Sequence, residues 1–243
     1  MVTTTPEKII IALVEGPNDE VGLTQLLRYW VKQRYNDREV KLAVVGTDLL
    51  QHERPVGPLG MLELVYGQVE SFLSKNKLDW ENLVEVIEIC DVDGVYLNDE
   101  LLQNQLGSIE YREHSIFCAD TDYIKNRNAR KRANIDELLA HHELQKGNHH
   151  LPFSLYYFSC NFEHVFFNSR NNTRQTKRHL ALQLDEEFSQ NPSHFFEIHF
   201  TKDVFPFSTY QESWDALRKE TTRIPRCSNL NVWLPSVTAP LIH

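Results

Sequence analysis

The sequence predicts an α/β protein: a mostly parallel sheet flanked by helices, followed by a mainly helical C-terminal extension. Three observations favour this class. Short apolar runs alternate with segments of helical periodicity, several of these runs end in an acid, and the pattern beyond residue 170 is mainly helical. Strands that alternate with helices indicate βαβ units, whose strands lie parallel because the helix carries the chain back. We expect a main domain over residues 1–170 and an extension over 171–243 that packs on it.

The expected strands are continuous apolar runs rather than runs of alternating polarity, which is typical of strands buried on both faces. The first run, Lys8 to Val14, is rich in isoleucine and ends at Glu15-Gly16-Pro17. Four further runs are expected to be strands: 40–45, 83–90, 115–118 and 153–159.

The expected helices lie between these runs. Leucines and Trp30 recur at helical spacing over 23–30, and Pro17 is well placed near a helix start. Further helices are expected over 61–73, 129–144 and 173–188. The Pro- and Gly-rich segment 52–60 predicts a loop.

The bulk properties are those of an ordinary globular protein, with 41% hydrophobic and 24% charged residues. No segment has the apolar length of a membrane span or the pattern of a signal peptide, so we expect a cytoplasmic protein without a membrane partner. The four cysteines form no CxxC pair, which disfavours a zinc ribbon. The net charge of −9 argues against a protein that coats nucleic acid by charge alone.

Acidic residues follow four of the expected strands. Because carboxyl ends of parallel strands share one edge, these carboxylates are expected to converge there. Carboxylates packed together repel one another unless a cation lies between them, and ligands that are all oxygen suit Mg²⁺ or Mn²⁺. The acids in question are Glu15, Asp91, Asp93, Asp120, Asp122 and Glu163.

The spacing of Asp91-Val92-Asp93 adds a geometric expectation. In extended chain, residues i and i+2 point the same way, so both carboxylates would face one metal site while Val92 packs inward. Gly94 would let the backbone turn and leave room for a substrate phosphate.

Two motifs resemble the signatures of the TOPRIM fold, a Rossmann-like α/β fold. Val14-Glu15-Gly16 looks like the first signature, and Ile87-Glu-Ile-Cys-Asp91-Val-Asp93 looks like the strand-terminal DxD of the second. Within that superfamily, Asp19 is placed like an acid of the OLD nucleases and RloB-like proteins. Ser159-Cys-Asn-Phe-Glu163 resembles the "NPCFE" segment of the RloB-like proteins, although its proline is absent and its cysteine and asparagine are transposed.

The resemblance implies a Mg²⁺-dependent endonuclease whose catalytic residues are Glu15, Asp91 and Asp93. Asp91 and Asp93 would coordinate the metal, and Glu15 would bind metal or act as general acid/base. Asp19 and Glu163 would complete a second metal position. Asp120 joins the expected ligand set through its place at a strand end, because the family offers no counterpart for it.

The same resemblance implies hydrolysis of DNA or RNA in anti-phage defence of the abortive-infection type. No GxxxxGK[ST] loop is present, so a separate ATPase partner is expected by analogy. Basic residues cluster at 125–132 and at 170–178, and Lys125 or Arg127 could stabilise charge in the transition state.

Two alternatives stay open. Asp91-Val-Asp93-Gly94 also resembles the first motif of haloacid-dehalogenase-like phosphatases, with Asp91 as nucleophile and with Ser159 and Lys177 in later motifs. The fold could instead be a non-catalytic TOPRIM scaffold that binds a partner protein through its C-terminal aromatic residues. Those aromatics are Phe195, Phe196, Phe205, Phe207 and Trp214.

Overall fold

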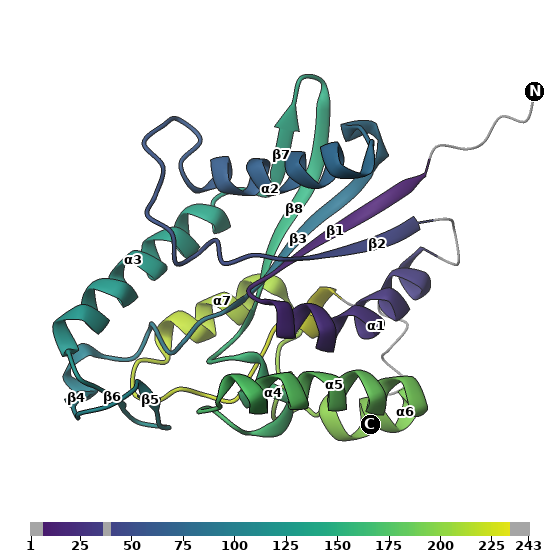
Figure 1. Cartoon of the computed structure of the whole chain (residues 1–243). Helices are drawn as coiled ribbons and strands as arrows, with labels where there is room; N and C mark the ends of the chain where they lie inside the picture. The colour runs from purple at the N-terminus through teal and green to yellow at the C-terminus, as the bar shows by residue number, and fades with distance from the viewer. Residues whose placement is uncertain (1–6, 36–39, 234–243) are drawn as a thin grey trace, which may run out of the picture.

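A computed structural model describes residues 7–35 and 40–233, and its centre is a five-stranded sheet in the order β2-β1-β3-β8-β7 (Figure 1). Four strands are parallel, and β7 pairs with β8 antiparallel. The strands are β1 (Lys8–Val14), β2 (Val40–Gly46), β3 (Leu83–Asp91), β7 (Glu143–Lys146) and β8 (His149–Phe158). The predicted α/β class with a mostly parallel sheet is confirmed.

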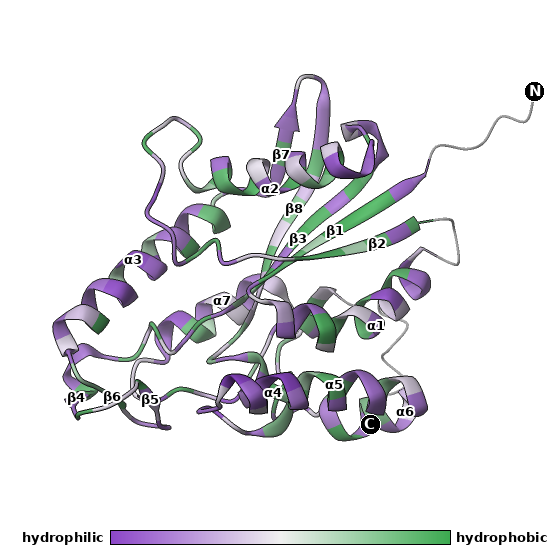
Figure 2. Ribbon diagram, in the orientation of Figure 1, coloured by the Kyte–Doolittle hydropathy of each residue, from purple (hydrophilic) through white to green (hydrophobic). Residues whose placement is uncertain are grey.

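The register brings the carboxyl ends of the three central strands to one edge. Val14 of β1 lies beside Ile89 of β3, and Asp91 of β3 pairs with Phe158 of β8. The inner strands are mainly apolar, as Figure 2 shows for β1, because both faces are covered, and β3 buries Glu85 and Glu88 as well. The residues that directly follow these strands therefore lie near one another along this edge of the sheet.

Helices cover both faces of the sheet. One face packs against α2, α3 and α7, through side chains such as Val65, Ile135 and Trp214. The other face packs against α1, α4, α5, α6 and the 3-10 turn η3. The helices are α1 (Pro17–Arg34), α2 (Met61–Asn76), α3 (Thr121–Leu139), α4 (Phe162–Phe167), α5 (Arg174–Gln190), α6 (Pro192–His199) and α7 (Tyr210–Lys219), with 3-10 turns η1 (Trp80–Asn82), η2 (Asp99–Leu101) and η3 (Leu230–Trp233).

The expected strand 115–118 does form, but in another sheet. Ile116–Cys118 is β6, the middle strand of a three-stranded sheet with β4 (Leu102–Asn104) and β5 (Glu110–Tyr111). Among the described residues, β6 pairs with β4 and β5 and with no strand of the main sheet. The carboxyl end of β6 therefore does not share the edge of the main sheet.

Two boundaries also differ from the expectation. Helix α3 begins at Thr121 rather than near residue 129, because the side chain of Asp120 caps it. The predicted helix end at 144 is wrong, since Glu143–Lys146 pairs with His149–Pro152 in a hairpin with Gly147 at φ 59°. The sequence does not distinguish this short strand from a helix end, because only Leu144 of its four residues is buried.

The C-terminal aromatic residues lie in the core. Phe195, Phe196, Phe205 and Trp214 are buried, and Phe207 packs against the first core cluster. Four of these five side chains therefore offer no exposed apolar surface, and the scaffold alternative stays a prediction. Within the described residues, no helix has the length and apolarity that crossing a bilayer requires.

A glycine pair tests the packing of α1 on α4. A Cβ at Gly22 would lie 2.5 Å from Cζ of the buried Phe162, whereas a Cβ at Gly67 of α2 meets no atom within 4 Å. We expect Gly22→Ala to lower the free energy of unfolding by about 1–3 kcal/mol and Gly67→Ala to raise it by about 0.5–1 kcal/mol. Urea denaturation measures both, and equal effects of the two alanines would contradict the packing.

Candidate carboxylate site

Four segments of the chain meet in a polar cavity of about 250 Å³ at the carboxyl edge of the sheet. The four main segments are the start of α1, the turn after β2, the turn after β3 and the start of α4, and β5, α3 and α5 add one residue each. The cavity is lined by Glu15, Gly16, Asn18, Asp19, Asp48, Gln51, Asp91, Asp93, Tyr111, Arg127, Glu163 and Lys177. Five of the six expected metal ligands are among these residues.

Glu15, Asp93 and Lys131 form the charged centre of one side of the site. The Lys131 ammonium lies 3.0 Å from Oε1 of Glu15 and 2.7 Å from Oδ2 of Asp93. Oε2 of Glu15 also accepts a hydrogen bond of 2.7 Å from the backbone N–H of Asp91. Glu15 is therefore oriented by the adjacent strand and by a cation from α3.

The Asp91-Val92-Asp93 turn differs from the extended geometry that the sequence predicts. Strand β3 ends at Asp91, and Asp93 and Gly94 both have left-handed backbone angles, with φ 55° and 64°. The N–H groups of Val92 and Asp93 bond to the carbonyls of Phe158 and Cys160, at 2.8 and 2.9 Å. Both aspartates still line the cavity, because this turn is held against the end of β8.

Gly94 does not provide room for a substrate. A Cβ at this position would lie 2.6 Å from Cδ1 of Ile224, so the space is filled by the C-terminal segment. The glycine is needed for its positive φ and for this close contact. Val92 packs in the core, as expected.

Asp19, Asp91 and Glu163 form the other side of the site. Oδ1 of Asp91 accepts a 3.1 Å hydrogen bond from the N–H of Phe162 at the start of α4. Glu163 is 1% exposed, and its Oε2 has no hydrogen-bond partner; the Lys177 ammonium lies 3.5 Å away as a charge contact. This side therefore holds three buried carboxylates against one partly exposed lysine.

Burial and mutual repulsion shift the pKa values of these carboxyl groups. Burial, with the charges of Glu163 and Glu15, raises the pKa of Asp19 to about 8. Burial and the neighbouring Asp19 and Glu15 also raise the pKa of Asp91 well above its usual range. Burial raises the pKa of Glu15, although the Lys131 ammonium opposes this shift. The metal-free site is therefore electrostatically unfavourable when its carboxyl groups are ionised.

The cations that face the site keep their charge. Burial disfavours a charged Lys131, but Asp93 and Glu15 outweigh it and hold the pKa of Lys131 well above its ordinary value. Burial likewise opposes a charged Lys177, and Glu163 and Asp91 more than compensate, which raises its pKa.

Asp120 is not part of this site. It is exposed, does not line the cavity, and its Oδ1 accepts the N–H of Tyr123 as the N-cap of α3. The assignment of Asp120 as a metal ligand is not supported, because β6 belongs to the small sheet. Lys125 does not line the cavity either, and its ammonium pairs with the exposed Asp122 at 3.0 Å.

Some site residues were missed or misjudged in the sequence. Asp48 follows β2 and lines the cavity, a position that the rule of acids after strands could have found. Lys131 was visible only as one basic residue in a cluster, and nothing in the sequence marks it as buried. Arg127 does reach the site: its guanidinium donates to the hydroxyl of Tyr111 at 2.8 Å and to the carbonyl of Asp93 at 3.5 Å.

The donor set fits a hard divalent cation. Within 7–35 and 40–233, no three His, Cys, Asp or Glu side chains already have the arrangement of a metal site. Two features nevertheless fit a cation: the orphaned Oε2 of Glu163, and buried carboxylates whose repulsion a positive ion would relieve. Asp19, Asp91 and Glu163 would hold the cation on the open side. Glu15 and Asp93 would contribute further oxygen ligands while both also contact Lys131.

The phosphatase alternative requires a strand-end Ser159 at the site. The Ser159 hydroxyl instead donates to the carbonyl of Pro225 at 2.5 Å, and the residue does not line the cavity. Lys177 does line it. One of the two later motifs is therefore not in position.

Searches of protein-family models, curated proteins and solved structures returned no match to this chain.

Proposed function

We propose that this protein is a divalent-metal-dependent phosphodiester hydrolase that acts on nucleic acid. One observation supports this proposal above the others: Glu15, Asp19, Asp91, Asp93 and Glu163 come from distant parts of the chain and line one polar cavity. A purely structural set of acids would cap helices or face solvent, as Asp120 does. Keeping five carboxylates together in the folded state costs stability, and a site that recruits cations gives a reason for that cost.

The residues of the site would have separate roles in the proposed reaction. Asp91 and Glu163, fixed by β3 and α4, would orient the substrate's phosphate through the cation they hold. When bound, a divalent ion supplies Lewis-acid stabilisation of the negative charge that builds on the phosphoryl oxygens. Glu15 is placed to accept a proton from the attacking water, because its Oε2 is oriented by the Asp91 N–H.

Two lysines and one arginine at or beside the cavity would have different roles. Lys177 lies on the partly open side beside Glu163, so it is available to a substrate oxygen. Lys131 is buried and acts as a positioning residue for Glu15 and Asp93. Arg127 steadies the turn at Asp93. The defence role, the ATPase partner and the choice between DNA and RNA stay predictions from the resemblance.

The test is cleavage of plasmid, single-stranded DNA and tRNA, each with Mg²⁺, with Mn²⁺ and with EDTA. We expect cleavage of at least one nucleic acid with either metal and none with EDTA. Hydrolysis of p-nitrophenyl phosphate with all nucleic acids intact would favour the phosphatase. Metal-independent cleavage, or no reaction with any substrate, would contradict the proposal.

A further inference from the structure

A second cavity, of about 630 Å³, lies on the other side of the loop that joins α4 to α5. Arg170 of this loop lines the second cavity. The neighbouring Asn171 forms hydrogen bonds with the backbone of Tyr111, a residue that lines the carboxylate site. The remaining wall comes from residues 202–207 and 216–227. The volume lies within the range of small-molecule pockets, roughly 300–1,000 Å³.

Two arginines in this cavity are held in place by backbone groups. Arg226 donates from Nε to the carbonyls of His164 and Val165, both at 3.0 Å, and from Nη2 to Phe166 at 3.2 Å. The Arg170 backbone is fixed because its carbonyl accepts a 2.8 Å bond from the Asn161 amide. The guanidinium of Arg226 is thus preorganised before any ligand arrives, and Arg170 is anchored at its backbone.

Neither arginine has an acidic partner. Among the described residues, no carboxylate lies within 4 Å of Arg170 or Arg226, and the buried Nε of Arg170 has no hydrogen-bond partner. Nη2 of Arg170 makes only a 3.4 Å contact to the carbonyl of Ile224. Burial and the charge of Arg170 lower the pKa of Arg226, so the two guanidinium groups repel each other.

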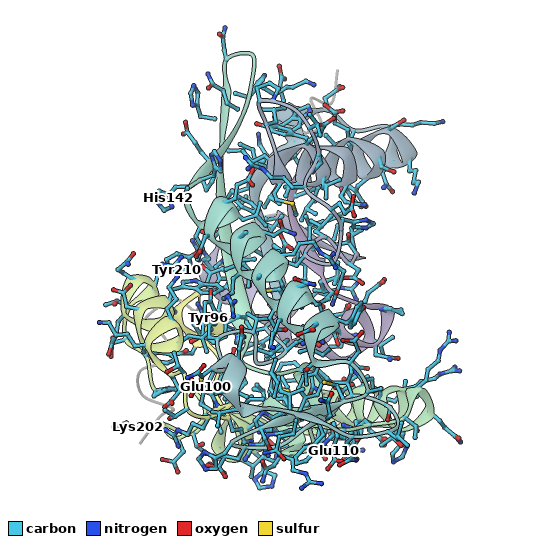
Figure 3. The ribbon with its side chains drawn as sticks, turned by 90° about the vertical axis from the view of Figure 1, so that its left-hand side faces the viewer. Tyr96, Glu100, Glu110, His142, Lys202 and Tyr210 are labelled. Carbon is cyan, nitrogen blue, oxygen red and sulfur yellow. The ribbon has the colours of Figure 1, made fainter. Side chains whose placement is uncertain are left out.

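The acids of the same cavity do not neutralise this pair. Glu220 is engaged by Arg223 at 3.0 Å. Glu113 and Asp203 also line the cavity, but both are exposed and neither lies within 4 Å of Arg170 or Arg226. Lys202, also exposed, adds a positive charge there; Figure 3 shows it at the edge of the molecule. Two partly buried guanidinium groups without a carboxylate partner, one of them held by three backbone carbonyls, are suited to bind an oxyanion through charge-assisted hydrogen bonds.

We propose that Arg170 and Arg226 form a phosphate-binding site, separate from the carboxylate site, that takes the phosphate monoester of a nucleotide. The group could come from a free nucleotide or from the phosphorylated end of a nucleic-acid strand, since both present the same oxyanion. The cavity has room for the attached nucleoside as well as the phosphate. This inference does not depend on the proposed catalytic activity.

The experiment is calorimetric titration of the full chain in EDTA, so that binding through a divalent ion cannot contribute. The probes are inorganic phosphate, adenosine 5′-monophosphate, and one oligonucleotide with and without a 5′-phosphate. We expect Arg170→Gln to weaken binding of phosphate and nucleotide by about tenfold to a hundredfold, the effect of losing a charge-assisted hydrogen bond. Arg54→Gln, which alters an arginine paired with Glu137 outside the cavity, is the matched control and should bind like wild type.

The same titrations identify the source of the phosphate. Tighter binding of the mononucleotide assigns the site to a free nucleotide, and tighter binding of the 5′-phosphorylated strand over its unphosphorylated form assigns it to a strand end. Arg170→Gln removes one long contact, so its fold should persist, which circular dichroism checks. No binding of any probe to wild type, or equal affinity of wild type and Arg170→Gln, would overturn the proposal.

Discussion

Asp91→Asn should reduce metal-dependent cleavage by a factor on the order of 10³ or more, equivalent to about 4 kcal/mol of activation free energy. Asp91 is buried at the end of β3, faces Asp19 and Glu163 across the cavity, and is fixed by the Phe162 N–H. The amide keeps the shape and can still accept that hydrogen bond, but it removes one negative charge from the ligand set. Initial rates of cleavage at saturating Mg²⁺ give the measurement.

Asp120→Asn is the control for this change. It makes the same chemical substitution at an exposed helix cap, and asparagine caps helices about as well as aspartate. We expect its cleavage rate to stay within about twofold of wild type, since the side chain lies outside the cavity. A large loss in Asp120→Asn, or an unaffected Asp91→Asn, would show that the carboxylate cavity is not the reaction site.

The free energy of unfolding of the metal-free protein should fall as the pH rises from 6.5 to 8, by on the order of 1–2 kcal/mol for each carboxyl group whose folded pKa is about 8. Asp19 has a folded pKa of about 8 and an ordinary value of 3.8, so the folded state binds the extra proton throughout this window. Stability is lost as the pH rises wherever the folded state binds more protons. Burial and Arg170 lower the pKa of His164 to about 3, which acts in the opposite direction but only below pH 6.5. Chemical denaturation in EDTA at several pH values measures the slope.

Two variants separate this electrostatic effect from cation binding. Asp19→Asn and Glu88→Gln should both flatten the slope, because burial and the charge of Glu15 also raise the pKa of Glu88 to about 8. Only Asp19 lines the cavity, so only Asp19→Asn should also reduce the rise in melting temperature that Mn²⁺ produces at pH 8. A wild-type slope in Asp19→Asn would contradict the shifted pKa, and an undiminished response to Mn²⁺ would remove Asp19 from the ligand set.

The main sheet could be predicted because its strands carry their signal locally. Residues 9–14 are apolar throughout, and Leu83–Asp91 is mainly apolar although it contains Glu85 and Glu88. Such runs indicate a parallel strand covered on both faces. The same rule placed Glu15 and Asp91 at one edge. It failed for Asp120, because three apolar residues identify β6 as a strand but do not say which sheet it joins.

The burial of Lys131 could not be predicted from the sequence. This lysine lies in a run of basic residues on α3 that includes the more exposed Lys125, yet its side chain is 1% exposed and bridges Glu15 and Asp93. Which basic residue turns inward depends on how α3 packs against the sheet, a relation between segments 116 residues apart. The left-handed turn at Asp93 likewise depends on bonds to Cys160.

The carboxyl end of β8 is completed by residues made late in the chain. Ser228 bridges to Phe158, Asn229 accepts the N–H of Tyr157, and Ile224 fills the space against Gly94. These pairings link positions about 70 residues apart or more, so closing them costs chain entropy that local helices do not face. The edge of the sheet that carries the carboxylate cavity should therefore be among the last parts of the fold to form, after the local helices.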